Sequence, residues 1–360
     1  MRDRGAGIVL HPSTIRYLTD NGIKAVSEVG VPVGRLRYLA RDGGVASEEP
    51  CRFRFTSYYA LYRDLLDCFD ADRYHLGREV VGFDAARHGV DVHLAGGEDA
   101  RSDLLVCADG VRSSARTRLL PEVSPRYAGY VGWRGAVACS ALEPATLAAL
   151  EGAITYWVMP HSHLLAYPIP AADGHAAGAA RAMNWVWYRN VAPGQELAEL
   201  LTDRSGARRS VSVPPGFAQE RHLAELVSTA RDALPRPLAD LIAGTPAPFV
   251  QAVFDIEIPR MAFGRVCLIG DAAFALRPHI AAGTAKAAED ALRLGEAVAR
   301  ANDDVEAALR AWEPHQLALG KRALERTREA GRRSQFSNSW QVGDPLPFGL
   351  YEQGDSALPQ

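Results

Sequence analysis

Two apolar runs, each followed by an aspartate, predict buried strands of an α/β sheet. Val266–Ile269 leads into Gly270–Asp271, and Leu104–Ala108 leads into Asp109–Gly110. Continuous apolar runs are typical of strands that helices cover on both faces, and a helical pattern follows each run. Ligands bind at the carboxyl ends of such strands. Both aspartates are therefore expected at the ligand-binding edge of a central sheet.

The residues before the helix that follows Asp271 suit an anionic or electron-rich ligand. Gly283–Thr284 precede an alanine-rich helical pattern that runs from about Ala285 to Ala301. The first amide N–H groups of a helix have no partner inside the helix, and the helix dipole is positive at that end. We therefore expect the amides near Gly283 to contact a ligand.

The middle of the chain has the pattern of an antiparallel sheet. Runs rich in aromatic and β-branched residues, separated by turn residues, lie at 130–135, 154–158, 164–170 and 185–188, and 171–178 is predicted to be a turn. A strand presents alternate residues to its two faces, so the pattern does not select the face that meets a ligand. The candidates for a ligand-facing wall are Tyr156, His161, His163, Tyr167, Trp185 and Tyr188.

Local patterns predict the remaining elements. Ser13 is expected to cap a helix that ends near Asn21. The helix predicted at 57–67 has one apolar face, made of Tyr58, Leu61, Leu65 and Phe69. The other predicted elements are hairpins at 30–50 and 79–94, helices at 196–202, 222–234 and 304–330, and a strand at 249–256.

Composition excludes several classes of protein. The 360 residues are 48% hydrophobic and 23% charged, as in ordinary globular proteins, and the net charge of −3 gives no basic footprint for nucleic acid. The five cysteines are dispersed, which favours a reducing compartment over a disulfide framework. We expect a cytoplasmic protein with no membrane span and no signal peptide. No metal site is expected, because His161 and His163 lack nearby acidic or cysteine partners.

The run from Gly270 to Ala273, with Pro278 and Gly283 behind it, resembles the second FAD fingerprint of the FAD-dependent aromatic-ring monooxygenases. The motif Asp109–Gly110 matches a further motif of that family. The resemblance implies an FAD cofactor, NADH or NADPH as electron donor, O2, and a small aromatic substrate. The cofactor-binding residues that it implies are Arg4, Arg63, Asp109, Gly110, Asp271, Pro278, Gly283, Thr284 and Ala285.

Further runs narrow the resemblance to the 2,6-dihydroxypyridine 3-hydroxylase branch of that family. They are Gly129–Gly135, Asn184–Asn190 and Arg277–His279. The chain departs from many relatives at Phe274, where they carry histidine, and at Ala281, where they carry glycine. The implied activity is hydroxylation of a hydroxypyridine-like or phenolic ring.

The implied fold class is α/β (α+β mixed), an FAD-binding Rossmann-like three-layer domain with an inserted antiparallel-sheet substrate domain. The predicted segments are a first FAD-binding part at 1–122, a substrate-binding sheet at 123–250, a second FAD-binding part at 251–302, and a C-terminal helix with an irregular tail at 303–360. A homodimer is a further expectation from the family.

The N-terminal residues Arg4–Pro12 resemble the segment that follows the second strand of the nucleotide-binding fold. We therefore expect the chain to lack the first βαβ unit, whose strands and glycine-rich turn supply contacts to the adenosine half of FAD. The remaining sheet should then expose apolar faces and a free edge. Two alternatives stay open: a non-catalytic ligand-binding protein, and a fragment of a longer gene product. A nicotinamide dehydrogenase fits poorly, because it needs the same missing fingerprint.

Ring hydroxylation also needs a group that deprotonates or orients the substrate hydroxyl. Histidine suits this task because it titrates near neutral pH. The first candidate is His279, beside the expected flavin ring, and the second is His11, whose segment lies near the active site in the resembled family.

Overall fold

A computed structural model describes residues 7–171 and 181–358. The helices are α1 (Pro12–Asp20), α2 (Tyr58–Leu66), α3 (Ser114–Leu119), α4 (Pro144–Leu150), α5 (Gln195–Leu200), α6 (Glu220–Ala233), α7 (Arg236–Ala243), α8 (Gly283–Arg300) and α9 (Val305–Gln335). The strands are β1 (Gly7–Val9), β2 (Val31–Leu39), β3 (Val45–Ser57), β4 (Val80–Ala86), β5 (Gly89–Leu94), β6 (Asp99–Ser102), β7 (Leu105–Cys107), β8 (Arg126–Ala138), β9 (Ala153–Met159), β10 (Ser162–Pro170), β11 (Arg181–Asn190), β12 (Ser212–Val213), β13 (Phe249–Asp255), β14 (Ala262–Phe263) and β15 (Val266–Leu268).

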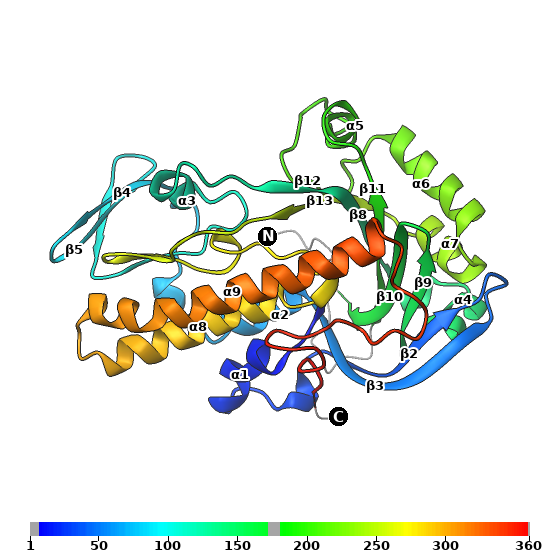
Figure 1. The fold of residues 1–360 in the computed structure, drawn as a ribbon, viewed down its shortest axis with the longest axis horizontal. Helices are drawn as coiled ribbons and strands as arrows, with labels where there is room; N and C mark the ends of the chain where they lie inside the picture. The colour runs from blue at the N-terminus through cyan, green and yellow to red at the C-terminus, as the bar shows by residue number, and fades with distance from the viewer. Residues whose placement is uncertain (1–6, 172–180, 359–360) are drawn as a thin grey trace.

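The largest sheet has nine strands, in the order β1-β3-β2-β9-β10-β11-β8-β13-β12. One face packs against α4, α6 and α7, which lie together at one end of the molecule (Figure 1). This face carries the indole rings of Trp133, Trp185 and Trp187, all of them buried. Neighbouring residues of these strands point to the opposite face, against which part of the C-terminal tail packs.

The predicted sheet is present, but it is larger than the pattern indicated. It includes β1, β2 and β3, which lie before residue 123, and β2 pairs with β9 in parallel. The hairpin predicted at 30–50 therefore forms an extension of the aromatic sheet. One sheet thus joins segments that the sequence placed in two domains, and the division into domains stays a prediction.

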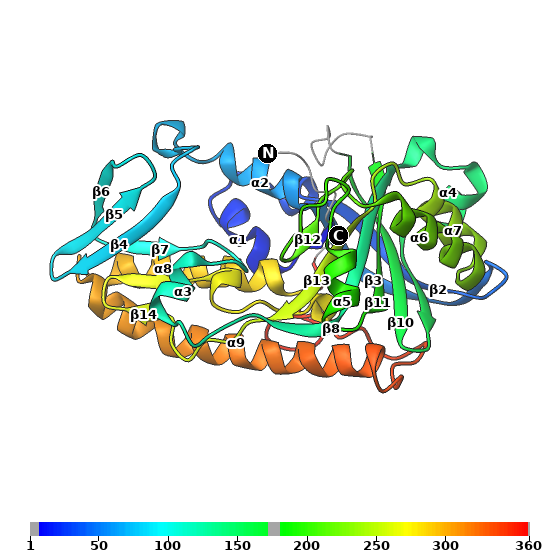
Figure 2. The same ribbon diagram turned by 90° about the horizontal axis from the view of Figure 1, so that it is seen from above.

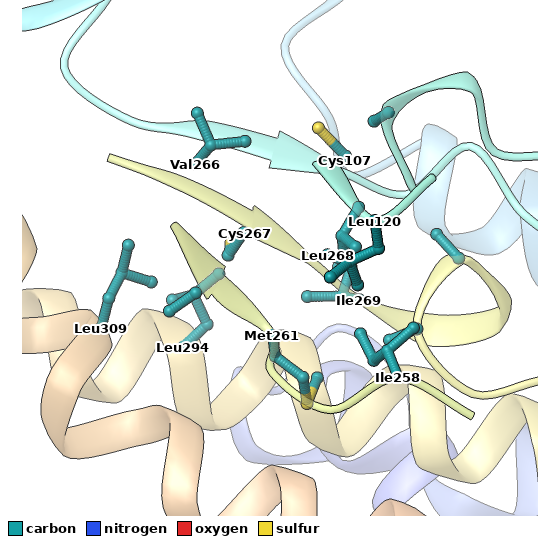
Figure 3. Packing of buried hydrophobic residues seen from close by; sticks show 14 of the residues in the cluster. Cys107, Leu120, Ile258, Met261, Val266, Cys267, Leu268, Ile269, Leu294 and Leu309 are labelled. Atoms are coloured by element: carbon teal, nitrogen blue, oxygen red, sulfur yellow. The ribbon is translucent and has the colours of Figure 1, made fainter. Parts of the chain in front are cut away.

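A smaller sheet holds the strand that was predicted to be central. β15 lies between β14 and β7, pairs with β7 in parallel, and is buried along its length. Figure 3 shows its side chains packed with Met261, Leu294 and Leu309. Burial of such side chains contributes about 1.5–3 kcal/mol each. The predicted mixed α/β fold class is confirmed.

The strand β7 differs from its prediction as a buried strand. Cys107 is buried, but Val106, which points to the other face, is 38% exposed, and β7 pairs on one side only among the described residues. β7 is thus an edge strand of the small sheet among the described residues. Val81 of β4 and Leu76 before it are also exposed, at 64% and 78%.

Two helix predictions need correction. The N-cap of α1 is His11 rather than Ser13, because Pro12 occupies the first helical position, where its missing N–H costs nothing. The apolar face predicted for α2 is mostly exposed, and only Leu61 is buried. Leu61 packs with Leu10, Ile15 and Leu18 of the α1 region. Tyr58 instead lines the cavity described below, and the ring of Phe69 lies edge-on to that of Tyr74.

The C-terminal part of the chain connects the two sheets. α8 and α9 pack side by side, and α9 runs along the length of the molecule (Figure 2). The tail then returns across the aromatic sheet, where Trp340, Leu346 and Phe348 pack against Tyr38 and Tyr156. The predicted irregular tail is therefore ordered by packing. Among the residues that the structure describes, no helix combines the length and apolar character needed to cross a bilayer.

Candidate active site

A cavity of about 550 Å³ lies between the ends of the small sheet and the face of the aromatic sheet that points away from α4, α6 and α7. The small sheet contributes Ala108 and Gly110 after β7, and Ile269, Gly270 and Asp271 after β15. The parallel pairing of β7 with β15 brings these two strand ends to one edge, as the sequence predicted. The predicted turn at 171–178 falls largely outside the described residues.

The register of the aromatic sheet decides which side chains reach the cavity. His163 pairs with Tyr188, and Tyr188 pairs with Gly132, so all three lie on one face. Of the six candidate wall residues, Tyr156, His163, Tyr167 and Tyr188 line the cavity. Trp185 points to the opposite face and donates a 2.8 Å hydrogen bond to Thr245. His161 lies in the turn before β10 and does not line the cavity.

Two buried histidines form the centre of this wall. Nε2 of His279 lies 2.7 Å from the hydroxyl oxygen of Tyr130, and Nδ1 of His163 accepts a 3.2 Å hydrogen bond from Gln335. The ring centroids of His163 and His279 are 5.4 Å apart, and Tyr188 is 5.0 Å from His279. His279 thus presents a ring to the cavity while one nitrogen is already bonded.

Burial keeps the groups of this wall uncharged. It lowers the pKa of His163 to about 3 and lowers the pKa of His279 well below its ordinary value, with a smaller effect in the same direction from His163. Burial also raises the pKa of the hydroxyls of Tyr130 and Tyr188. At neutral pH the histidines therefore act as neutral hydrogen-bonding groups, and His279 is a weak base.

Asp271 lies where β15 ends, and its side chain is accessible from the cavity. Protein surrounds it on its other sides and raises its pKa, while the charge of Lys286 opposes this shift. Lys286 is fully buried behind it, with Nζ 2.6 Å from Asp290 and 4.8 Å from the ring centroid of Phe274. Asp290 also accepts a 2.9 Å hydrogen bond from the amide of Gly270. This buried pair fixes the turn that carries Asp271.

The N-terminus of α8 opens onto the same cavity. Gly283 and Thr284 line it, and within the described chain no acceptor is found for the first amides of the helix. A Cβ on Gly283 would meet no atom within 4 Å, so the backbone is open to a ligand. Pro278 also lines the cavity, whereas Ala285 is buried beside α9. These amides thus lie at the cavity, at the helix end where the sequence predicts ligand contact.

His11 lies beside this loop but outside the cavity lining. Its Nε2 is 2.8 Å from the carbonyl oxygen of Ala281, and its ring is buried. Ala281 has a left-handed backbone with φ 55°, a conformation that costs a non-glycine residue about 1 kcal/mol or more. Glycine would adopt the same backbone conformation without that cost. His11 is thus placed to hold the loop and does not face the cavity.

The other residues implied by the resemblance are less central. Gly110 lines the cavity, whereas Asp109 accepts a 3.2 Å hydrogen bond from the amide of Ala115 at the start of α3. Arg63 is exposed on α2. Arg4 lies outside the described residues. The strand ends and the α8 terminus are therefore together in the fold, while Asp109, Arg63 and His11 are not in the lining.

Three lining residues were not singled out from the sequence, namely Arg134, Gln251 and Trp340. Neither was Tyr130, which lies behind the lining in contact with His279. Tyr130 and Arg134 lie in the run Gly129–Gly135, and their spacing of four residues puts them on one strand face. Once Tyr130 is known to lie on the face that meets the cavity, this spacing indicates that Arg134 lies on the same face. Trp340 comes from the irregular tail, where no local pattern predicts its position.

The lining fits the flavin part of FAD. The carboxylate of Asp271 faces the cavity and makes no hydrogen bond among the described residues, as a group that binds hydroxyls of a ribityl chain would. The free amides of α8 suit an electron-accepting ring edge. The cavity continues from these groups to the aromatic wall, which leaves space for a second ring.

Comparisons with known proteins agree with this geometry. The FAD binding domain-like family model matches residues 127–255. The 2,6-dihydroxypyridine 3-monooxygenase of Paenarthrobacter nicotinovorans is 36% identical over 348 residues, which are 96% of this chain and 86% of that protein. The FAD-dependent urate hydroxylase of Klebsiella pneumoniae is 26% identical, over 93% of this chain and 83% of that protein.

Solved structures show the same fold. The structure of 2,6-dihydroxypyridine-3-hydroxylase from Arthrobacter nicotinovorans matches with a TM-score of 0.90 and 36% identity, over 97% of this chain and 88% of that one. A Klebsiella pneumoniae structure complexed with FAD and uric acid matches with a TM-score of 0.76 at 22% identity, over 94% of this chain and 81% of that one.

The fold and the cavity define a flavin-binding α/β enzyme with an aromatic pocket. The chain belongs to the FAD-dependent aromatic-ring monooxygenases, within which it is similar to the 2,6-dihydroxypyridine 3-monooxygenase. The alternative of a non-catalytic ligand-binding protein has no support in these comparisons.

Proposed function

We propose that the protein hydroxylates the ring of a hydroxylated N-heteroaromatic compound, with FAD, O2 and either NADH or NADPH. The observation that carries this proposal is the single cavity that joins Asp271 and the α8 terminus to the histidine and tyrosine wall. The similarity to a hydroxypyridine enzyme favours a hydroxypyridine over a simple phenol.

Each side of the cavity has a separate task in this proposal. Asp271 and the amides of Gly283 and Thr284 hold the flavin, and bound FAD accepts electrons from NAD(P)H and activates O2. His279 orients the substrate hydroxyl through the nitrogen that Tyr130 leaves free. The buried aromatic wall excludes water from the reacting groups. Arg63, Asp109 and Gly110 are proposed to contact the phosphate part of the cofactor, as the family resemblance implies.

The proposal is tested with the purified chain, incubated with FAD and then desalted. We expect retained flavin absorption, and oxidation of NADH or NADPH that 2,6-dihydroxypyridine stimulates. The product should be heavier than the substrate by one oxygen atom, derived from ¹⁸O2 in a labelling experiment. Asp271→Ala is the matched variant, and it should lose flavin on desalting because its carboxylate is removed.

A colourless wild-type protein would contradict the claim that this chain holds FAD. Retained flavin without substrate-stimulated oxidation would instead leave the fold assignment intact and refute the substrate class. The two results separate cofactor binding from substrate choice.

A further inference from the structure

Arg134 of β8 is a cation without a partner on the cavity wall. Its side chain shares a sheet face with Val186 and Tyr188, as the register of β8 and β11 requires. Nε is buried and forms no hydrogen bond, and no ion pair of its guanidinium is found among the described residues. A Cβ on Gly132 would lie 3.6 Å from this Nε, an ordinary contact distance, so the two positions are neighbours on this face.

The groups of the aromatic wall do not neutralise this charge, and Asp271, which lines the same cavity, forms no ion pair with it among the described residues. His163 and His279 are neutral because burial lowers the pKa of both, and burial keeps the Tyr188 hydroxyl protonated by raising its pKa. Arg333, the other arginine of the lining, is paired with Asp344 at 2.6 Å. Arg134 as a whole is half-buried and lines the cavity, but its Nε has lost contact with water without gaining a partner, which is costly. The bare charge therefore indicates that an anionic ligand atom completes the site.

A second polar group lies next to Arg134. Gln251 of β13 pairs in register with Gly132, lines the same cavity, and makes no side-chain hydrogen bond within the described chain. Its amide donates two hydrogen bonds. A planar guanidinium beside an amide presents several donors toward one oxygen atom.

We propose that Arg134 and Gln251 form an oxyanion subsite that binds a deprotonated ring oxygen of the aromatic substrate. This inference rests on the proposed function and specifies the ionisation state that the site selects. The substrate enters as its anion and leaves the proton in solvent. An anionic ring oxygen makes the ring carbons more electron-rich, which favours attack on an electrophilic oxygen. His279 is then free to orient a second polar group of the ring.

Calorimetric titration of the FAD-loaded protein, without NAD(P)H, tests this subsite. The ligands are 2,6-dihydroxypyridine and 2,6-difluoropyridine. They share a pyridine ring, but only the dihydroxypyridine has an oxygen that can lose a proton. Arg134→Gln should weaken binding of the dihydroxypyridine about 10- to 100-fold and change that of the difluoropyridine less than about threefold. The affinity of Arg134→Lys for the dihydroxypyridine should lie between those of wild type and Arg134→Gln, because an ammonium keeps the charge but loses the planar fork of the guanidinium.

Arg333→Gln is the matched control, since it removes a paired arginine from the same cavity. It should change dihydroxypyridine binding less than about threefold. Equal weakening of both ligands by Arg134→Gln, or loss of flavin from that variant, would overturn the inference, because Arg134 would then act on the cofactor or the fold. If wild type binds dihydroxypyridine and Arg134→Gln binds it equally well, this inference alone fails. If wild type binds neither ligand, the proposed function fails with it.

Discussion

The contact between His279 and Tyr130 shows how burial determines the chemistry of a single residue. A histidine in water titrates near neutral pH and exchanges protons readily. In this cavity burial lowers the pKa of His279 well below that range, and the hydroxyl of Tyr130 occupies one of its nitrogens. The ring is therefore suited to orienting a hydroxyl more than to removing its proton. Arg134 supplies the permanent charge that the histidines lack.

Replacing His279 by Gln should lower kcat by about 10- to 100-fold, because loss of the group that orients the substrate hydroxyl can cost up to about 10² in rate. Tyr130→Phe should cost less, about 5- to 10-fold, since it removes one hydrogen bond and keeps the ring. Steady-state kinetics at saturating substrate measure both effects. Equal kcat values in wild type and His279→Gln would show that His279 has no role in catalysis.

The contribution of His279 to activity should depend on pH in one direction only. The neutral form of His279 is present above its lowered pKa and is lost as the pH falls through that pKa. The ratio of wild-type to His279→Gln activity should therefore stay constant above an ordinary histidine pKa of about 6.5 and decline only in more acidic solution. A break in that ratio near neutral pH would show that the ring is more exposed than the structure places it.

At the scale of elements, α9 approaches the cavity so closely that one position requires glycine. A Cβ on Gly331 would lie 2.9 Å from the hydroxyl of Tyr130 and 3.1 Å from Cδ2 of His279. Such contacts are too short for a side chain, and the atoms that they meet are themselves buried. The helix therefore determines where the pair of His279 and Tyr130 can lie. A helix that is remote in sequence thus becomes part of the site.

Gly331→Ala should displace the His279 and Tyr130 pair. We expect the free energy of unfolding to fall by about 1–3 kcal/mol through overpacking, and kcat/KM to fall about tenfold or more through misplacement of His279. Gly295→Ala in α8 is the matched control, because a Cβ there meets no atom within 4 Å. The free energy of unfolding of that variant should rise by about 0.4–1 kcal/mol. Chemical denaturation and steady-state kinetics compare the two, and wild-type behaviour of Gly331→Ala would refute the close packing.

At the scale of the whole molecule, the end formed by β4 and β7 differs from the end that carries the aromatic sheet. Leu76, Val81 and Val106 are exposed there, and β7 has a free edge among the described residues. Exposed apolar residues beside an unpaired strand edge favour association with other chains. The aromatic sheet, by contrast, is covered by helices on one face and by α9 and the tail on the other.

Replacing Leu76 and Val81 together by Lys should reduce self-association of the purified protein. The added charges repel other chains, and both positions are exposed, so stability should change by less than about 0.5 kcal/mol. Static light scattering over a range of protein concentrations measures the association, and thermal unfolding is the control. An unchanged concentration dependence would show that this surface is not where the chains meet.

The sequence determined the elements whose patterns are local. The apolar runs before Asp109 and Asp271, the alternation of the aromatic strands and the long helices of the C-terminal half all form near the predicted residues. They do so because burial of one strand or one helix face depends on residues a few positions apart. The shared position of Asp271 and Gly283 at one cavity also follows from local patterns. Asp271 follows the end of β15, Gly283 begins α8, and both ends lie at the same edge of the small sheet.

The tertiary structure alone decided which side chains meet across that cavity. The face of the aromatic sheet was set by register and by the packing of Trp185 against the helices, and a register cannot be read from one strand. The exposure of Tyr58 and Leu65 depends on what covers α2, and the placement of His11 outside the lining depends on the turn at Ala281. Burial likewise fixed the charge states, because it sums contributions from elements far apart in the chain.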